Sequence, residues 1–171
     1  CCLYMITLNN PPGLKTFSGL NMHTPNPPLG LAYIAGRLRE AGYDFSVIDA
    51  VGEKLDQIKT FEYRSDLKVQ GLDLVEIVER VNPSTTLFGV TCTFSTFWPL
   101  ARKLISELHK TFPDATIILG GEHETAVPES VLRSSDVEVV ILGEGEETFI
   151  NLISAISAGH PLSGVGGIAF L

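Results

Sequence analysis

Cysteine is scarce in this sequence, with three among 171 residues, at positions 1, 2 and 92. Their spacing matches no metal-binding motif and supports no disulfide framework, which fits a reducing compartment. The sequence also shows no signal peptide and no apolar run long enough to span a bilayer. These absences argue against a disulfide-stapled secreted protein and a membrane-spanning one, and we expect a cytoplasmic protein.

Positive charge is also limited. Lys and Arg total 12 against 20 Asp and Glu, which gives a formal net charge of −8. A broad basic face for nucleic acid is therefore not expected. Hydrophobic residues make up 44% of the chain and charged residues 19%, as in a globular protein. A chain of this length buries roughly 70% of its unfolded surface and needs no disulfide or metal to stabilise its fold.

The most informative stretch is residues 117–145, which read IILGGEHETAVPESVLRSSDVEVVILGEG. Two short apolar runs, residues 116–119 and 137–142, have the length and β-branched content of buried strands. Each run is followed by glycines, Gly120 and Gly121 after the first and Gly143 and Gly145, with Glu144 between them, after the second. Glycine lets the backbone turn sharply and lets a ligand approach it closely. Between the runs, Pro128 suits the first position of a helix. The pattern predicts strand, turn, helix, strand and turn.

The rest of the chain alternates in the same way. Further strands are predicted at residues 2–8, 43–49 and 85–90. The polar segment 53–71 is predicted to form a helical turn plus a surface insertion. The long loop from residue 9 to residue 28, which contains His23, is either functional or mobile. Apolar residues recur at helical spacing in the segments 27–41, 74–81, 97–112 and 146–158.

Strands that alternate with helices predict an α/β fold, a doubly wound parallel five-stranded sheet in three α/β/α layers. The natural order at this size is 2-1-3-4-5, as in flavodoxin, with the switch point between strands one and three. Ligands of such sheets lie beyond the carboxyl ends of the strands. The cleft should therefore be lined by the loops after Leu8, Val90, Leu119 and Leu142.

A last apolar run at residues 167–171 bears on the domain organisation. It suggests a larger protein, with a Rossmann-like domain at residues 1–160 and a linker and strand at residues 161–171. The alternative is a complete small protein with a strand at its end.

Common nucleotide and hydrolase motifs are missing. There is no G-x-x-x-x-G-K-[ST] phosphate loop and no G-x-G-x-x-G after the first strand. The G-x-S-x-G nucleophile elbow is absent. Thr91 and Cys92 stand where a receiver domain would carry an aspartate. The loop after the first strand also lacks the hydroxyl groups of a flavodoxin phosphate loop.

Polar residues gather at the predicted strand ends. Helix capping uses one or two hydroxyls, whereas the loop after the third strand has four, which favours a ligand role. Asp49 ends the second strand, where an acidic residue either binds hydroxyl groups of a ligand or forms a turn. Glu144 and its acidic neighbours precede the last helix, where carboxylates also suit the helix dipole. The four hydroxyl residues are Thr91, Thr93, Ser95 and Thr96.

Several segments together resemble the N-terminal cobalamin-binding domain of B12-dependent radical SAM enzymes. The first is PPLGLAYIA at 27–35, followed by VID at 47–49. The others are GGEH at 120–123 with Pro128 and Glu129, and GEGE at 143–146 with Thr148 and Phe149. The closing GIAF at 167–170 looks like the strand that precedes the catalytic barrel in such proteins. The resemblance covers nearly the whole chain and is weakest at residues 53–71.

This resemblance implies a cobalamin over the carboxyl ends of the strands, with its nucleotide tail in the cleft. The four hydroxyl residues of the loop after the third strand would contact the tail or the corrin amides. Gly120 and Gly121 would let the tail pass close to the backbone. The turn 143–145 would cap the far side of the tail, with the carboxylate of Glu144 as a partner for corrin amides. The implied cofactor-binding residues are Asn9, Thr91, Thr93, Ser95, Thr96, Gly120, Gly121, His123, Gly143, Glu144 and Gly145.

The chain departs from cobalamin proteins in two places. The D-x-H-x-x-G motif, whose histidine binds cobalt in mutase-type domains, is replaced by NNPPG at 9–13. We expect His123 to serve structure or touch the tail, and predict no metal ligand. The C-x-x-x-C-x-x-C cluster motif is also missing. The [4Fe-4S] cluster, S-adenosylmethionine and small-molecule substrate would then belong to a C-terminal radical SAM domain of the same chain, of methyltransferase type, and this fragment alone would be non-catalytic.

Two other hypotheses stay open. One is a degenerate flavodoxin-like docking or scaffold domain that no longer binds cobalamin. The other is a small hydrolase or nucleotide-dependent transferase that uses Asp49, His123 and Glu144, although their spacing supplies no nucleophile–base pair.

Overall fold

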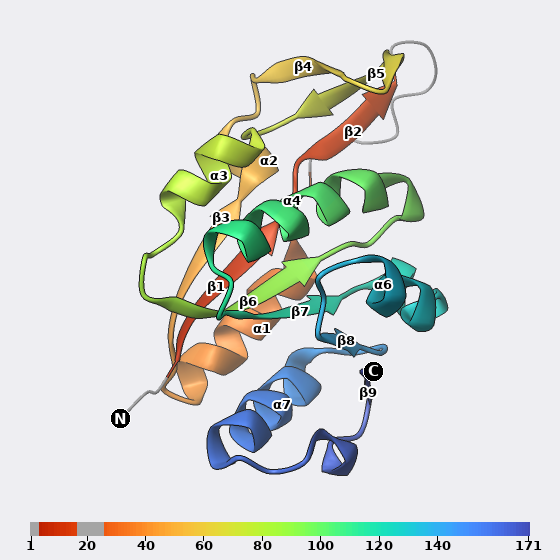
Figure 1. The fold of residues 1–171 in the computed structure, drawn as a ribbon. Coiled ribbons are helices and arrows are strands. Elements are labelled where there is room, and N and C mark those ends of the chain that lie inside the picture. Colours follow the sequence, from red (N-terminus) through yellow and green to blue (C-terminus); the bar gives the residue numbers. More distant parts are fainter. Residues whose placement is uncertain (1–3, 17–25) are drawn as a thin grey trace.

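The structure, a computed structural model, describes residues 4–16 and 26–171. Its centre is a six-stranded sheet in the order β3-β1-β6-β7-β8-β9 (Figure 1). The first five strands of that row pair in parallel and follow the predicted order 2-1-3-4-5, while β9 joins β8 antiparallel, an edge strand that the five-stranded prediction lacked. The strands are β1 (Met5–Asn10), β3 (Asp44–Asp49), β6 (Thr85–Thr91), β7 (Thr116–Gly120), β8 (Val139–Ile141) and β9 (Ile168–Ala169).

Helices cover both faces of this sheet, which confirms the three-layer α/β/α prediction (Figure 1). The helices α1 (Leu29–Glu40) and α7 (Glu146–Ala158) pack on one face. On the other face lie α3 (Leu74–Arg80), α4 (Trp98–Thr111) and α6 (Pro128–Ser134). The shorter elements are α2 (Ala50–Glu53), α5 (Glu122–Ala126), η1 (Ser95–Phe97) and η2 (Leu162–Gly164).

Local sequence explains these layers. Successive strand residues point to opposite faces, so Leu87 packs against the α1 and α7 side, whereas Phe88 packs against the α4 side. Asp73 and Glu76 form a capping box at the start of α3. After α7, Gly159 adopts a left-handed conformation with φ 66°, which a side chain would disfavour. The predicted glycine stop of this helix is confirmed.

A second, three-stranded antiparallel sheet was not predicted. It has the order β2-β5-β4, formed by β2 (Gly13–Thr16), β4 (Ile58–Phe61) and β5 (Arg64–Gln70). The reading of residues 53–71 as a helical turn and a surface insertion was therefore incomplete. Charged side chains on the exposed part of the hairpin hide its alternation. Its residue Phe61 packs with Leu14 of β2 and Leu100 of α4 in a separate apolar cluster. His23 lies outside the described residues.

The first strand ends two residues later than predicted, at Asn10 in place of Leu8. Asn9 and Asn10 belong to β1 and not to a loop, in register with Ile48 and Asp49 of β3. Neighbouring strands on both sides supply backbone partners at this point, and this outweighs the loop preference of asparagine. The carboxyl edge of the sheet is thereby extended towards Pro11.

Candidate functional site

Two adjoining cavities lie at the carboxyl ends of the parallel strands. We call them the helix cavity, of about 230 Å³, between the sheet and the helices α1 and α7, and the loop cavity, of about 290 Å³, between the loops after β1 and β6. Both are lined by Gly30, Leu31, Thr91 and Thr93, so they adjoin at the start of α1 and the end of β6. The predicted cleft is therefore present at the predicted edge of the sheet.

The floor of the helix cavity consists of residues that share one face of the sheet. Gly89 and Gly120 occupy two of these positions on β6 and β7: a side chain on Gly120 would enter the cavity, whereas Gly89 lets Leu8 and Phe149 pack against the strand. A Cβ on Gly89 would lie 2.7 Å from Leu8 Cδ2 and 3.1 Å from Phe149 Cζ. We did not predict Gly89 as a site residue, although an isolated glycine inside a strand is a signal of close approach.

The two predicted glycine turns meet at the rim of the helix cavity through Thr125. Its hydroxyl donates to the carbonyl oxygen of Gly121 at 2.8 Å and accepts from the amide of Gly143 at 3.0 Å. Gly120, Gly121 and the turn 143–145 all line the cavity. Thr125, on α5, therefore holds the two turns together, and the sequence pattern did not reveal this role.

Gly121 also has a structural reason to be glycine. Its φ of 145° is rarely adopted by other residues, and a Cβ there would lie 2.6 Å from the carbonyl oxygen of Cys92. The backbone of the β7 turn is thus pressed against the loop after β6.

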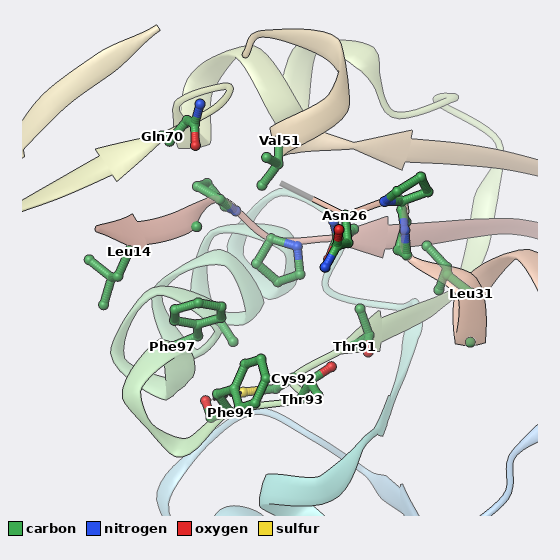
Figure 2. Close-up of a pocket in the computed structure, with 18 of the residues that line it drawn as sticks. Leu14, Asn26, Leu31, Val51, Gln70, Thr91, Cys92, Thr93, Phe94 and Phe97 are labelled. Atoms are coloured by element: carbon green, nitrogen blue, oxygen red, sulfur yellow. Dashed lines mark hydrogen bonds between the residues drawn. The ribbon is translucent and has the colours of Figure 1, made fainter. Parts of the chain in front are cut away.

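The loop cavity is bordered by segments that are distant in sequence, residues 10–15, 26–31 and 91–94 among them (Figure 2). Figure 2 shows Thr91, Thr93 and Phe94 on one side and Val51 and Gln70 across from them. Asn10 also lines this cavity, and its side-chain amide donates to Asp49 at 2.7 Å. Asp49 therefore anchors the end of β1.

The predicted hydroxyl cluster is divided by the structure. Thr91 and Thr93 line both cavities, whereas Ser95 and Thr96 belong to η1 and line neither. Ser95 lies 2.9 Å from Nδ1 of His123, whose ring packs beside Trp98 with 5.1 Å between the ring centroids. Burial lowers the pKa of His123. These contacts make His123 a link between the loops after β6 and β7.

Asn9 lies beneath the cavities and does not line them. Its side chain is fully buried, and its amide reaches the Thr7 carbonyl at 3.4 Å. Among the described residues, its Oδ1 has no hydrogen-bond partner. Asn9 and Leu8 are adjacent in the strand, so their side chains point to opposite faces.

A buried carboxyl group lies next to this site. Glu124 on α5 is fully buried, and neither of its carboxyl oxygens has a partner among the described residues. Burial raises its pKa to about 7. Burial, together with the nearby Glu124, raises the pKa of the Cys92 thiol to about 12, so this cysteine is an inert thiol at neutral pH.

The residues of the two cavities fit a corrinoid. The helix cavity combines an apolar floor and roof with hydroxyl groups, glycine backbone and a carboxylate at its rim, which matches an aromatic base that leads out to a phosphate and to corrin amides. Within residues 4–16 and 26–171, no cluster of three His, Cys, Asp or Glu could hold a metal ion. In the same described part of the chain, no helix is long and apolar enough to cross a bilayer.

A wound parallel sheet of order 2-1-3-4-5, hollowed at its switch-point edge, defines a flavodoxin-like cofactor-binding domain. The family model of the B12 binding domain matches residues 18–153. The chain belongs to this family.

Curated relatives are methyltransferases and cyclases. An uncharacterized methyltransferase of Pyrococcus horikoshii is 31% identical over 150 residues, which cover 86% of this chain and 28% of the relative. The anaerobic magnesium-protoporphyrin IX monomethyl ester cyclase of a Synechocystis strain is 32% identical over 149 residues, which cover 84% of this chain and 26% of the cyclase. The cytidylyl-2-hydroxyethylphosphonate methyltransferase of Streptomyces wedmorensis is 27% identical over 146 residues, covering 84% and 27%. The chain spans about a quarter of these relatives.

Solved structures show the same fold. The radical S-adenosylmethionine methyltransferase TsrM of Kitasatospora setae, solved with cobalamin and a [4Fe-4S] cluster bound, has a TM-score of 0.69 at 22% identity and covers 98% of this chain and 27% of its own. The cobalamin-dependent S-adenosylmethionine radical enzyme OxsB, solved with aqua-cobalamin and S-adenosylmethionine bound, has a TM-score of 0.71 at 20% identity, with 98% and 21% covered.

The alternative of a hydrolase or transferase finds no support in the geometry. Asp49 ends β3 and Glu144 follows β8, and these two strands are separated by three others. At the usual strand spacing this puts them roughly 19 Å apart. Among the described residues, no hydrogen bond joins any two of Asp49, His123 and Glu144; Asp49 pairs with Asn10 and His123 with Ser95.

Proposed function

We propose that this chain holds cobalamin over the carboxyl ends of β1, β6, β7 and β8, with the nucleotide tail in the helix cavity. The supporting observation is that the helix and loop cavities adjoin at the ends of the strands, with Gly120 in the floor where a side chain would otherwise stand. Bound cobalamin supplies a cobalt centre that can carry a methyl group. The chain's own task is to bind and orient it.

The contacts suggest separate roles for the predicted residues. Thr91 and Thr93 stand where the cavities join, and their hydroxyls can bind the tail phosphate or a corrin amide. Gly120, with the turn 143–145, leaves room for the tail, and the Glu144 carboxylate can accept from corrin amides. Gly121 supports the turn after β7. Four of the predicted residues lie outside the cavity lining and have supporting roles. Asn9 supports the end of β1, and the loops after β6 and β7 are supported by Ser95, Thr96 and His123.

The whole protein is proposed to be a radical SAM enzyme of methyltransferase type. The relatives' names and their much greater length support this, since the chain covers 22–28% of each. S-adenosylmethionine, a [4Fe-4S] cluster and a small-molecule substrate would then bind in a further domain of the same chain, in the cytoplasm. We keep residues 1–160 as the cobalamin domain and 161–171 as the segment leading onward, which contains η2 and the edge strand β9 paired with β8.

Binding can be tested with the purified chain and hydroxocobalamin. The mixture is gel-filtered, the cobalamin absorbance in the protein peak is measured, and the affinity is obtained by titration. Gly120→Val is the diagnostic variant: the φ at residue 120 is not in the left-handed region, and the new Cβ would start 3.8 Å from Ile141 Cβ, inside the cavity. We expect about tenfold weaker binding or more, since the tail would meet the new side chain.

Gly164→Val is the matched control, because a Cβ there meets no atom within 4 Å and residue 164 lines neither cavity. A colourless wild-type protein peak at micromolar concentrations would contradict cobalamin binding. Equal affinity of wild type and a folded Gly120→Val variant would contradict the placement of the tail.

A further inference from the structure

The deep part of the helix cavity contains no side chain that can form a hydrogen bond. Its walls there are Leu8, Ile34, Ile118, Ile141 and Phe149, from the sheet, α1 and α7. Leu8 and Ile118 belong to strands that are paired on both sides, so the peptide groups of this floor are used within the sheet. The hydroxyls and carboxylates of the lining belong to strand ends and turns at the rim.

Natural corrinoids differ in the base that ends their nucleotide tail. The base is a benzimidazole in cobalamin, and it is a purine such as adenine in other members of the class. Adenine carries an exocyclic amine and two more ring nitrogens than a benzimidazole. A polar group that is buried without a partner loses its hydrogen bonds to water and gains none, so an apolar chamber rejects it. The methyl groups of dimethylbenzimidazole instead gain from burial against leucine and isoleucine.

We infer that the helix cavity selects corrinoids by their base, accepting a benzimidazole and discriminating against a purine. This inference rests on the proposed function, because it requires the tail to enter the helix cavity. It assigns Ile34, Ile141 and Phe149 as specificity-determining residues. Ile34 faces Gly145 near the start of α7, where a Cβ on the glycine would lie 3.4 Å from Ile34 Cδ1, so it is placed to touch a base that enters there.

The test compares three corrinoids on the same purified chain: cobalamin, the adenine-containing cobamide, and cobinamide, which lacks the nucleotide tail. We expect cobalamin to bind at least about tenfold more tightly than either of the others. Equal affinities of cobalamin and the adenine cobamide, with weaker cobinamide, would overturn the selectivity and leave the tail site intact. Equal binding of cobinamide and cobalamin would overturn both the selectivity and the tail placement. Binding of none of the three would remove the proposed function itself.

A polar group placed in the chamber should reduce the discrimination. Ile34→Gln keeps a good helix former in α1 and adds an amide that can pair with adenine. We expect the cobalamin-to-adenine affinity ratio to fall by about threefold or more. Tyr33→Gln is the matched control, because this neighbouring side chain is 63% exposed and lines neither cavity. An unchanged ratio in a folded Ile34→Gln variant would contradict the role of Ile34, and Ile34→Asn provides a second, shorter variant for the same comparison.

Discussion

Gly145 lies next to Ile34 in the lining of the helix cavity, and a Cβ added to Gly145 would lie 3.4 Å from Ile34 Cδ1. The backbone at Gly145 has φ −93° and ψ −16°, which any residue can adopt. The position therefore needs no glycine for its conformation. The missing side chain instead lets Ile34 and Ile141 approach the backbone at the start of α7, in the lining of the helix cavity.

The first prediction follows from this pair. Gly145→Leu should still fold, because the backbone at residue 145 suits any residue, and should bind hydroxocobalamin about tenfold more weakly or worse, because the leucine would occupy the tail's space. Titration of the absorbance change measures it. The control is Gly36→Leu, an exposed α1 position where a Cβ meets no atom within 4 Å. Wild-type affinity in folded Gly145→Leu would show that the tail does not pass this point.

A second prediction concerns His123 and the cobalt. Its Nδ1 atom is 2.9 Å from Ser95 Oγ, its ring packs beside Trp98, and the residue lines neither cavity. The absorbance spectrum of bound hydroxocobalamin in His123→Ala should therefore match that of the wild type. The free energy of unfolding should fall by about 1 kcal/mol, from the lost hydrogen bond. His160→Ala, at an exposed position, is the control. A spectrum characteristic of a lost imidazole ligand would contradict this assignment.

Gly121 provides a test of stability. With φ at 145° and the Cys92 carbonyl oxygen 2.6 Å from the position of a Cβ, Gly121→Ala combines backbone strain with a collision. We expect a loss of about 2–4 kcal/mol in the free energy of unfolding, measured by urea denaturation. Gly166→Ala should change it little, since a Cβ there meets nothing within 4 Å. A loss below about 1 kcal/mol would mean that the β7 turn relaxes without cost.

The buried Glu124 predicts a pH dependence of stability. Burial raises its pKa from 4.5 to about 7, so the folded protein holds this proton more tightly than the unfolded chain. The contribution of protonated Glu124 to the free energy of unfolding is complete below the unfolded pKa of 4.5, and it is lost as the pH rises through about 7. The loss amounts to about 3 kcal/mol at most.

Chemical denaturation between about pH 5 and pH 8 measures this effect. Glu124→Gln should show a smaller fall in stability over that range than the wild type. All other carboxyl groups are shared by the two proteins, so the difference isolates Glu124. Glu129→Gln, at an exposed position on α6, should behave as the wild type. Parallel pH profiles of wild type and Glu124→Gln would contradict the raised pKa.

The parallel core was predictable because its signals are local and repeated. Short apolar runs alternate with helical stripes, and the last helix has the predicted bounds of residues 146–158. The three-stranded antiparallel sheet was not predicted because the exposed part of its hairpin carries charged residues such as Arg64 and Asp66, a pattern that is typical of a surface insertion. The antiparallel pairing of β9 with β8 depends on partners far apart in sequence.

The candidate site was predicted in part. Gly120, Gly121 and the turn 143–145 could be found because glycine after a buried run is conspicuous, and Thr91 and Thr93 because hydroxyls cluster beside them. Ser95 and Thr96 belong to the same cluster, yet the 3-10 turn of η1 carries them away from both cavities. The positions of these four residues in the sequence could not tell the two that line the cavities from the two that do not.

By itself, the sequence determined the wound sheet, its strand order and the edge at which a ligand would lie. Periodicity of two or 3.6 residues and the glycine stops are properties of the chain alone. Tertiary structure decided which residues share a surface. Gly89 of β6 meets Leu8 and Phe149, and Thr125 joins two turns on different strands, only because parallel pairing brings those segments together. A cavity is the space that several distant elements leave between them, and no single segment encodes it.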